Sequence, residues 1–301
     1  MIDTKCRGGA QRISEESAGR KKMQKPIAVM GMSGVGKTRI ASLLRKDANW
    51  FHYSVDYRIG TRYLGEAIAD EFKREAMKNP MLRDMLLSDS IYISSNITFE
   101  NLAPLSAFLG KPGDPQKGGI PFAEYLRRQR LHRAAEIAAL GDVPAFIEKA
   151  RAIYGYQHFI CDSGGSICEV VDPDDPNDPV LKVLSNACTL VYIAGDEAHA
   201  DALKARFSKA PKPMYYNEAF LKKIWVDYLA AKGVAETSVD PDDFIRWGFA
   251  RLIDWRRPRY EAIAKNWGVT VSARDIEKVA TPAAFLGLIA NLDRSHAANS
   301  S

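Results

Sequence analysis

A glycine-rich turn between an apolar segment and a helical pattern constrains this chain more than any other feature. The turn reads Gly31-x-x-x-x-Gly36-Lys37-Thr38 and follows the apolar run 27–30. It matches the phosphate-binding loop (P-loop, or Walker A) pattern, in which backbone N–H groups and the positive end of a new helix face phosphate oxygens. A chance match in an ordinary strand-to-helix turn is the alternative. Because strand, loop and helix occur in the order that the pattern requires, the turn predicts nucleotide binding.

The loop assigns separate roles to two side chains. Lys37 is expected to bridge the β- and γ-phosphates of ATP, and the Thr38 hydroxyl to hold Mg²⁺. ATP and Mg²⁺ are therefore the expected cofactors, although the sequence does not distinguish ATP from GTP. The residues expected to contact the nucleotide are Gly31, Ser33, Gly34, Val35, Gly36, Lys37, Thr38 and Arg39.

Asp56 follows the aromatic and β-branched segment 50–55, which predicts the second strand. Ligands in open α/β sheets bind beyond the carboxyl ends of the strands, so Asp56 and Arg58 are candidate substrate-binding residues. Asp56 is also the candidate catalytic base. The alternative is that Asp56 caps the helix that follows it.

A second acidic residue, Asp162, ends the apolar segment 158–162 and precedes the turn Ser163-Gly164-Gly165. An acidic residue at the end of a buried strand is what a phosphate-binding loop needs nearby, because it helps to hold Mg²⁺ beside Thr38. Gly164 and Gly165 would let the backbone approach a substrate. The alternative is that Asp162 caps N–H groups of its own turn.

The remaining apolar segments, 187–194 and 268–271, alternate with helical patterns. Strands separated by helices predict an α/β fold with a mostly parallel five-stranded sheet between two helical layers. Helical patterns also cover 218–231 and 242–253, and Asp178 with Pro179 is expected to open another helix.

The region from about 60 to 155 is mostly helical and is expected to form a helical insertion. Within it, 90–99 fits a short strand or an extended loop, and the glycine- and proline-rich stretch 110–119 fits a lid or a surface linker. Arg127 and Arg130 fit an anion site or a solvated face on which Arg133 pairs with Glu136.

The charge distribution argues against two classes of partner. Residues 1–25 hold seven Lys/Arg and three Asp/Glu, a net +4 of the total +5, so the remaining chain is close to neutral. Neither a nucleic-acid surface nor a membrane surface is indicated, and no apolar run approaches the ~18 residues of a membrane span. We expect the leader 1–25 to be disordered, with Met23 as an alternative start, and residues 26–301 to form the folded domain. The four cysteines lack C-x-x-C spacing, which suits a reducing compartment and a cytoplasmic location.

Together these motifs resemble those of the small-molecule P-loop kinases, and shikimate kinase and its relatives in particular. The loop 31–38 is similar to the family's nucleotide loop, and the Asp162–Gly165 turn to its glycine-rich turn under the substrate. Asp56 matches the acidic residue that contacts the acceptor hydroxyl in that family. Arg206 with the Lys212-Pro213-Met214 segment looks like the family's lid, and the segment 256–260 (RRPRY) resembles its arginine-x-proline-leucine-tyrosine segment.

The resemblance implies transfer of the ATP γ-phosphate to a hydroxyl of a small metabolite. It implies that Arg206 and Lys212 act with Lys37 and Asp56 as catalytic residues, closing over the phosphates, and that Arg58 or Arg256 clamps an anionic group on the acceptor. Lys212 departs from the family, which has arginine there. The resemblance implies that the region 60–155 shapes the substrate region, and its length argues against shikimate itself. A regulatory ATPase, or a nucleotide-dependent switch that acts on a protein partner, is the alternative function. A kinase that acts on a nucleotide or a protein is a third. The acceptor and the oligomeric state are not specified by the sequence.

Overall fold

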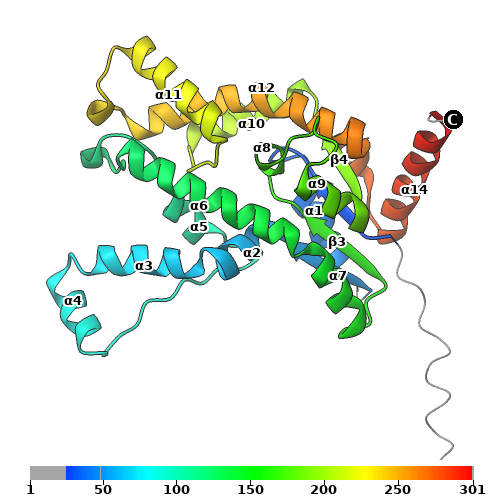
Figure 1. The fold of residues 1–301 in the computed structure, drawn as a ribbon, viewed down its shortest axis with the longest axis horizontal. Helices are drawn as coiled ribbons and strands as arrows, with labels where there is room; N and C mark the ends of the chain where they lie inside the picture. The colour runs from blue at the N-terminus through cyan, green and yellow to red at the C-terminus, as the bar shows by residue number, and fades with distance from the viewer. Residues whose placement is uncertain (1–24, 48, 300–301) are drawn as a thin grey trace, which may run out of the picture.

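The protein is described by a computed structural model that covers residues 25–47 and 49–299, with side chains through residue 292. The expected disordered leader and the alternative start at Met23 lie outside these described residues, apart from Lys25. Five strands form one parallel sheet in the order β2-β3-β1-β4-β5 (Figure 1), which confirms the expected α/β class. The strands are β1 (Ile27–Met30), β2 (Trp50–Ser54), β3 (His158–Asp162), β4 (Thr189–Ala194) and β5 (Gly268–Ser272).

Both faces of the sheet are covered by helices, because successive side chains of a strand point to opposite faces. In β1, Val29 packs into a cluster with Ile40 and Leu44 on one face, while Met30 packs with Leu140 on the other. The first face is covered by α1 (Lys37–Arg45), α13 (Ala273–Lys278) and α14 (Pro282–Asn299). The second is covered mainly by α6 (Phe122–Gly141), α7 (Val143–Ala152), α8 (Ile167–Val170), α9 (Pro179–Ala187) and the carboxyl half of α12 (Pro241–Trp267). Helix, sheet and helix thus form three layers.

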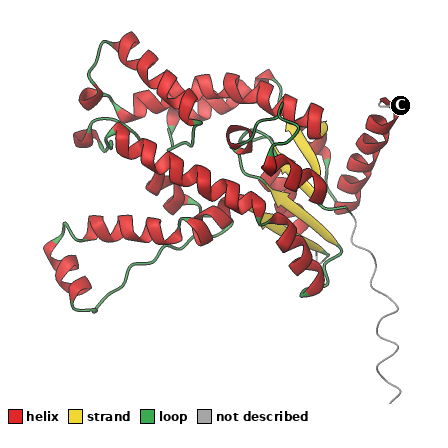
Figure 2. Cartoon of the chain, in the orientation of Figure 1, coloured by secondary structure: helices red, strands yellow, loops and turns green. Residues whose placement is uncertain are grey.

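A third apolar cluster lies outside these layers, among helices that extend away from the sheet (Figure 2). Its members include Phe207, Trp225 and Phe244, which belong to α10, α11 and the first half of α12. The remaining helical segments are α2 (Val55–Arg58), η1 (Ile59–Tyr63, a π-helix), α3 (Gly65–Ala76), α4 (Pro80–Leu87), α5 (Ala103–Leu109), η2 (Pro115–Lys117), α10 (Glu197–Lys209), α11 (Glu218–Lys232) and η3 (Glu236–Ser238). The cyan α3 and α4 project away from the sheet at the lower left of Figure 1.

One helix is longer than the sequence pattern indicates. The segment after 253 was expected to lie outside the helix 242–253, but α12 continues through Pro258 to Trp267. Proline removes one backbone N–H, so the carbonyl of Asp254 loses its helical partner. Pro258 and Asp254 are both exposed, so this carbonyl lies on the water-facing side of the helix, where the loss costs least.

The structure can also be compared with the other local expectations from the sequence. Residues 90–98 form neither helix nor strand, so the extended-loop interpretation of 90–99 is correct. Asp178 accepts hydrogen bonds from the N–H groups of Val180 and Leu181 and opens α9 before Pro179, as predicted. Cys161, Cys168 and Cys188 are buried and unpaired. Within the part of the chain that the structure describes, none of the helices combines the length and apolarity needed to cross a bilayer.

Candidate functional site

The register of the sheet brings three motifs to one edge. Asp162, the last residue of β3, lies opposite Val29 of β1 on one side and Ser54 of β2 on the other. Strand β3 therefore lies between the strand that precedes the glycine-rich loop and the strand that precedes Asp56. All three strands run in parallel, so the segments that follow them meet at the same edge.

The glycine-rich loop has the backbone that an anion site requires. Gly31, Gly34 and Gly36 have φ values of 142°, 84° and 100°, which residues other than glycine rarely adopt. A Cβ atom on Gly31 would also lie 2.7 Å from the carbonyl oxygen of Ile193. No side chain caps the start of α1 at Gly36, so the first N–H groups of that helix are not occupied by a capping side chain.

Lys37 and Thr38 contribute the polar side chains of the loop. Lys37 is 7% exposed, and its ammonium group donates to the carbonyl oxygens of Gly31 (2.7 Å) and Met32 (2.8 Å). Burial lowers the pKa of this ammonium, an effect that the nearby Asp162 and Asp56 oppose. The neighbouring carboxylates therefore favour the charged form of Lys37.

Asp162 contacts both its own turn and Thr38. Its Oδ1 accepts from the N–H of Gly164 (3.1 Å), which caps the local turn, and its Oδ2 accepts from the Thr38 hydroxyl (3.3 Å). Two hard oxygen atoms thus lie together, the ligand type that Mg²⁺ prefers. No group of three or more His, Cys, Asp or Glu side chains forms a metal cluster among the described residues, so this pair would need phosphate oxygens and water to complete a coordination shell.

A single cavity of ≈ 390 Å³ joins these groups, a volume within the range of small-ligand pockets. Its lining residues are Ser33, Gly34, Gly36, Lys37, Thr38, Arg39, Asp56, Asp162, Gly164, Gly165 and Glu277. Most of the residues expected to bind nucleotide, both candidate carboxylates and both glycines of the turn therefore share one cavity.

Asp56 lies in the first turn of α2, but it does not cap that helix. The cap is Ser54, whose hydroxyl accepts from the N–H of Tyr57, so the helix-cap interpretation of Asp56 is wrong. The Asp56 carboxylate instead lies against the glycine turn, where a Cβ atom on Gly164 would approach Oδ1 to 2.6 Å. Burial, followed by the negative charge of Asp162, raises the pKa of Asp56 to about 6.

Arg206 reaches the loop from α10. Its Nη2 atom lies 3.1 Å from the position that a Cβ on Gly34 would occupy, so the guanidinium lies directly beside the loop. Within the described residues this guanidinium makes no hydrogen bond or ion pair, which leaves its donors available. Lys212, the second lid candidate, is exposed in the segment after α10. Neither Arg206 nor Lys212 lines the cavity.

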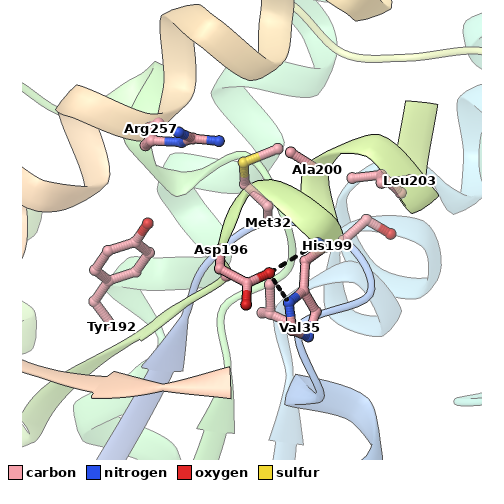
Figure 3. Close-up of a pocket in the computed structure, with 10 residues that line it drawn as sticks. Met32, Val35, Tyr192, Asp196, His199, Ala200, Leu203 and Arg257 are labelled. Atoms are coloured by element: carbon pink, nitrogen blue, oxygen red, sulfur yellow. Dashed lines mark hydrogen bonds and ion pairs between the residues drawn. The ribbon is translucent and has the colours of Figure 1, made fainter. Parts of the chain in front are cut away.

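The helix that carries Arg206 packs on the first half of the glycine-rich loop. Met32 and Val35 of the loop, Tyr192 of β4 and Leu203 of α10 line a second, small cavity there (Figure 3). Its volume of ≈ 20 Å³ has room for about one water, so it is too small for a metabolite. This apolar contact couples the position of α10 to that of the loop.

Two of the expected substrate-binding arginines are engaged elsewhere. Arg58 donates to Asp142 from Nε and Nη2, both at 2.8 Å, and does not line the cavity. Arg256 is 5% exposed and binds Glu169 (2.5 Å) and the carbonyl oxygens of Gly165 (2.7 Å) and Tyr215 (3.0 Å). Arg256 therefore stabilises the glycine turn through the carbonyl oxygen of Gly165 and does not itself line the cavity.

Arg39 lines the cavity, although its guanidinium is turned toward α13. It donates to the carbonyl oxygens of Ile276 (2.9 Å) and Val279 (3.1 Å). These bonds attach the end of α13 to α1. Arg39 thus supports the wall of the cavity that Glu277 also forms.

The sequence pattern missed a buried carboxyl group behind the glycine turn. Glu136 of α6 is fully buried, and both of its carboxyl oxygens lie 2.9 Å from the Ser166 hydroxyl, which follows the turn. Burial, followed by the charge of Asp56, raises the pKa of Glu136 to about 8. Its position four residues after His132, in an alanine-rich stretch, was the signal available in the sequence.

Arg127 and Arg130 of α6 occupy a solvated face, as one of the two interpretations held. Arg127 pairs with Glu124 at 2.7 Å and Arg130 with Glu218 at 2.7 Å. The expected pair between Arg133 and Glu136 does not form, because Glu136 faces the interior of the protein.

Comparison with known proteins adds no family assignment: neither a protein-family model nor a curated protein matches this sequence.

Proposed function

We propose that this protein is a P-loop kinase of the α/β/α class that transfers the γ-phosphate of ATP to a hydroxyl group of a small metabolite. One observation carries the proposal: Lys37, Thr38, Asp162 and Asp56 arise from three separate strand ends and line a single cavity of ≈ 390 Å³. Nucleotide loop, metal-binding oxygens and a candidate base are the parts that phosphoryl transfer requires.

The residues of the cavity, together with Arg206 beside the loop, divide the reaction between them. ATP with Mg²⁺ supplies the phosphoryl group and part of the charge neutralisation. The loop N–H groups and Lys37 bind the phosphates, while Thr38 and Asp162 provide oxygen atoms for the metal. The oxygen of the acceptor hydroxyl bonds to the γ-phosphorus while the bond between that phosphorus and the ADP oxygen breaks. Asp56 accepts the proton that the hydroxyl loses. Arg206 stabilises the charge on the phosphoryl oxygens.

The kinase proposal is tested by separating binding from transfer. The Asp56→Asn variant should bind ATP as the wild type does, because Asp56 contacts the acceptor and not the nucleotide. Its transfer rate should fall by roughly 10²–10⁴-fold, the usual contribution of a general base. Equal losses of ATP affinity and rate would show that Asp56 belongs to the nucleotide site or to the fold.

The alternative function, a nucleotide-dependent switch that acts on a protein, has one observation in its favour. Helix α4 and its flanks expose Met77, Met81, Met85, Leu87 and Tyr92, with exposed fractions from 37% to 89%. No described side chain between residues 73 and 96 belongs to a core cluster. Exposed apolar groups that support no core are typical of a surface for a partner protein.

Phosphate release distinguishes the two functions. A kinase consumes ATP in proportion to added acceptor and yields an organic phosphate, whereas a switch releases inorganic phosphate without any acceptor. The double variant Met81→Ser, Met85→Ser is the matched control. It should leave acceptor-dependent transfer unchanged in the kinase, and a change in nucleotide turnover would favour the switch.

A further inference from the structure

The side of the cavity around the glycine turn presents carboxyl groups. That side is formed by Asp56, Asp162 and the backbone of Gly164 and Gly165, with Glu136 behind them. The negative charge of Asp162 raises the pKa of Asp56, and that of Asp56 raises the pKa of Glu136, so the three carboxyl groups lie within electrostatic reach of one another.

The cations near these carboxyl groups are already engaged. Arg256 neutralises Glu169, to which its Nε atom donates at 2.5 Å, and its two remaining nitrogen atoms bind carbonyl oxygens. The Lys37 ammonium donates to two loop carbonyls, and Asp162 raises its pKa more than Asp56 does. Asp56 therefore makes no ion pair among the described residues, although the charges of Lys37 and Arg256 act on it from a distance.

The arginines that would suit an anionic acceptor do not point into this part of the cavity. Arg58 is held by Asp142, and the Arg39 guanidinium by carbonyl oxygens at the end of α13. Arg206 lies beside Gly34 of the phosphate loop and does not line the cavity. A carboxylate or phosphate group bound next to Asp56 would meet like charges in a partly dehydrated site, which is costly.

We propose, on the basis of the kinase function above, that the acceptor is a small alcohol without negative charge, and that an ammonium-bearing alcohol is preferred over a neutral one. The hydroxyl lies at Asp56, and the ammonium group interacts with the negative charge that the Asp56 carboxylate presents to the cavity. This assignment replaces the expectation that an arginine clamps an anionic acceptor.

The experiment uses the full chain and a small-molecule cell extract separated by ion exchange into cationic, neutral and anionic fractions. Each fraction is incubated with γ-labelled ATP, and labelled organic phosphate is measured. A matched series of hexosamine, hexose and hexuronate serves as a defined probe of the same three charges. We expect label from the cationic fraction, less from the neutral fraction, and at least about tenfold less from the anionic fraction, the ratio that a difference of 1.4 kcal/mol produces.

Two variants connect the charge preference to the proposed residues. Asp56→Asn keeps the size of the side chain but removes its charge, so the preference for cationic over neutral acceptors in the residual transfer should fall severalfold. Arg58→Gln is the control, because Arg58 lies outside the cavity, and its charge preference should match that of the wild type. ATP affinity, measured separately, reports whether each variant is folded.

The outcomes separate this inference from the kinase function itself. Label that comes mainly from the anionic fraction, or that is lost in Arg58→Gln, overturns the charge assignment while the kinase function stands. Bound ATP without label from any fraction overturns both. A wild-type protein that does not bind ATP contradicts the proposed function at its first step.

Discussion

The carboxylate of Asp56 lies where a side chain on Gly164 would have to be: a Cβ atom there would approach Asp56 Oδ1 to 2.6 Å. The two residues follow neighbouring strands, β2 and β3, and belong to segments more than 100 residues apart in the sequence. Because Gly164 has no side chain, the Asp56 carboxylate can pack directly against the turn. Gly164 also has a φ of 73°, which favours glycine independently of this contact.

Replacement of Gly164 by alanine should displace Asp56. We expect the transfer rate to fall by about 10²-fold, because small displacements of a reacting group cost that much. Gly155→Ala is the matched control: Gly155 has a φ of 70°, but a Cβ there meets nothing within 4 Å. Both variants should lose about 1–2 kcal/mol of stability through the left-handed backbone, measured by urea unfolding. Equal activities of the two variants would show that Asp56 does not need this contact.

Transfer activity should depend on the ionisation of Asp56. Since its pKa is raised to about 6, the carboxylate that accepts the hydroxyl proton is present above that pH and disappears below it. We expect kcat/KM to rise with pH through about 6 and then to level off. The residual activity of Asp56→Asn should lack this rise. An unchanged acidic limb in the variant would assign the ionisation to another group.

Arg206 should act on the transition state more than on bound ATP. It lies beside Gly34 without an ion pair among the described residues, so it is free to follow the charge that develops on the phosphoryl group. Arg206→Ala should lower kcat by roughly 10³-fold, the lower range for an arginine of this kind, with little change in ATP affinity. Lys209→Ala, an exposed lysine at the end of the same helix, should leave kcat unaltered. If both variants lose kcat equally, the effect arises from α10 as a whole.

Glu136 should make the stability of the protein depend on pH. Its pKa is raised to about 8 in the folded state by burial, so the folded protein binds more protons than the unfolded chain between its ordinary value of 4.5 and about 8. The contribution of Glu136 to stability therefore decreases as the pH rises through this interval. Urea unfolding at pH 5 and pH 8 measures this contribution as the difference between wild type and Glu136→Gln. The stability of the variant relative to the wild type should be greater at pH 8 than at pH 5. A stability difference that stays the same at both pH values would contradict the raised pKa of Glu136.

The sequence was sufficient to predict the strands and the loop because both depend on local patterns. Buried parallel strands appear as continuous apolar segments, and the glycines of the loop mark the positive φ values observed at Gly31, Gly34 and Gly36. The order of the strands is not local. That β3 lies between β1 and β2, and so brings Asp162 between the loop and Asp56, follows only from the pairing of strands.

The roles of charged side chains were the hardest part to predict. Arg58 and Arg256 stood at positions suited to a substrate, but their partners Asp142 and Glu169 are distant in sequence and could not be foreseen. Glu136 appeared to belong to a solvated helix face, although it is buried behind the turn. Whether a charged group serves a ligand or the fold is decided by tertiary partners, which a pattern along one chain does not contain.

The most direct test of the central claim is ATP binding to the glycine-rich loop, measured by calorimetry in the presence of Mg²⁺. The wild type and Lys37→Ala are compared with Lys265→Ala, an exposed lysine of α12 that lies outside the cavity. We predict that Lys37→Ala weakens ATP binding at least about tenfold, as expected for the loss of charge-assisted hydrogen bonds, while Lys265→Ala binds like the wild type. Equal affinity in all three proteins, or no binding to any of them, would contradict the account.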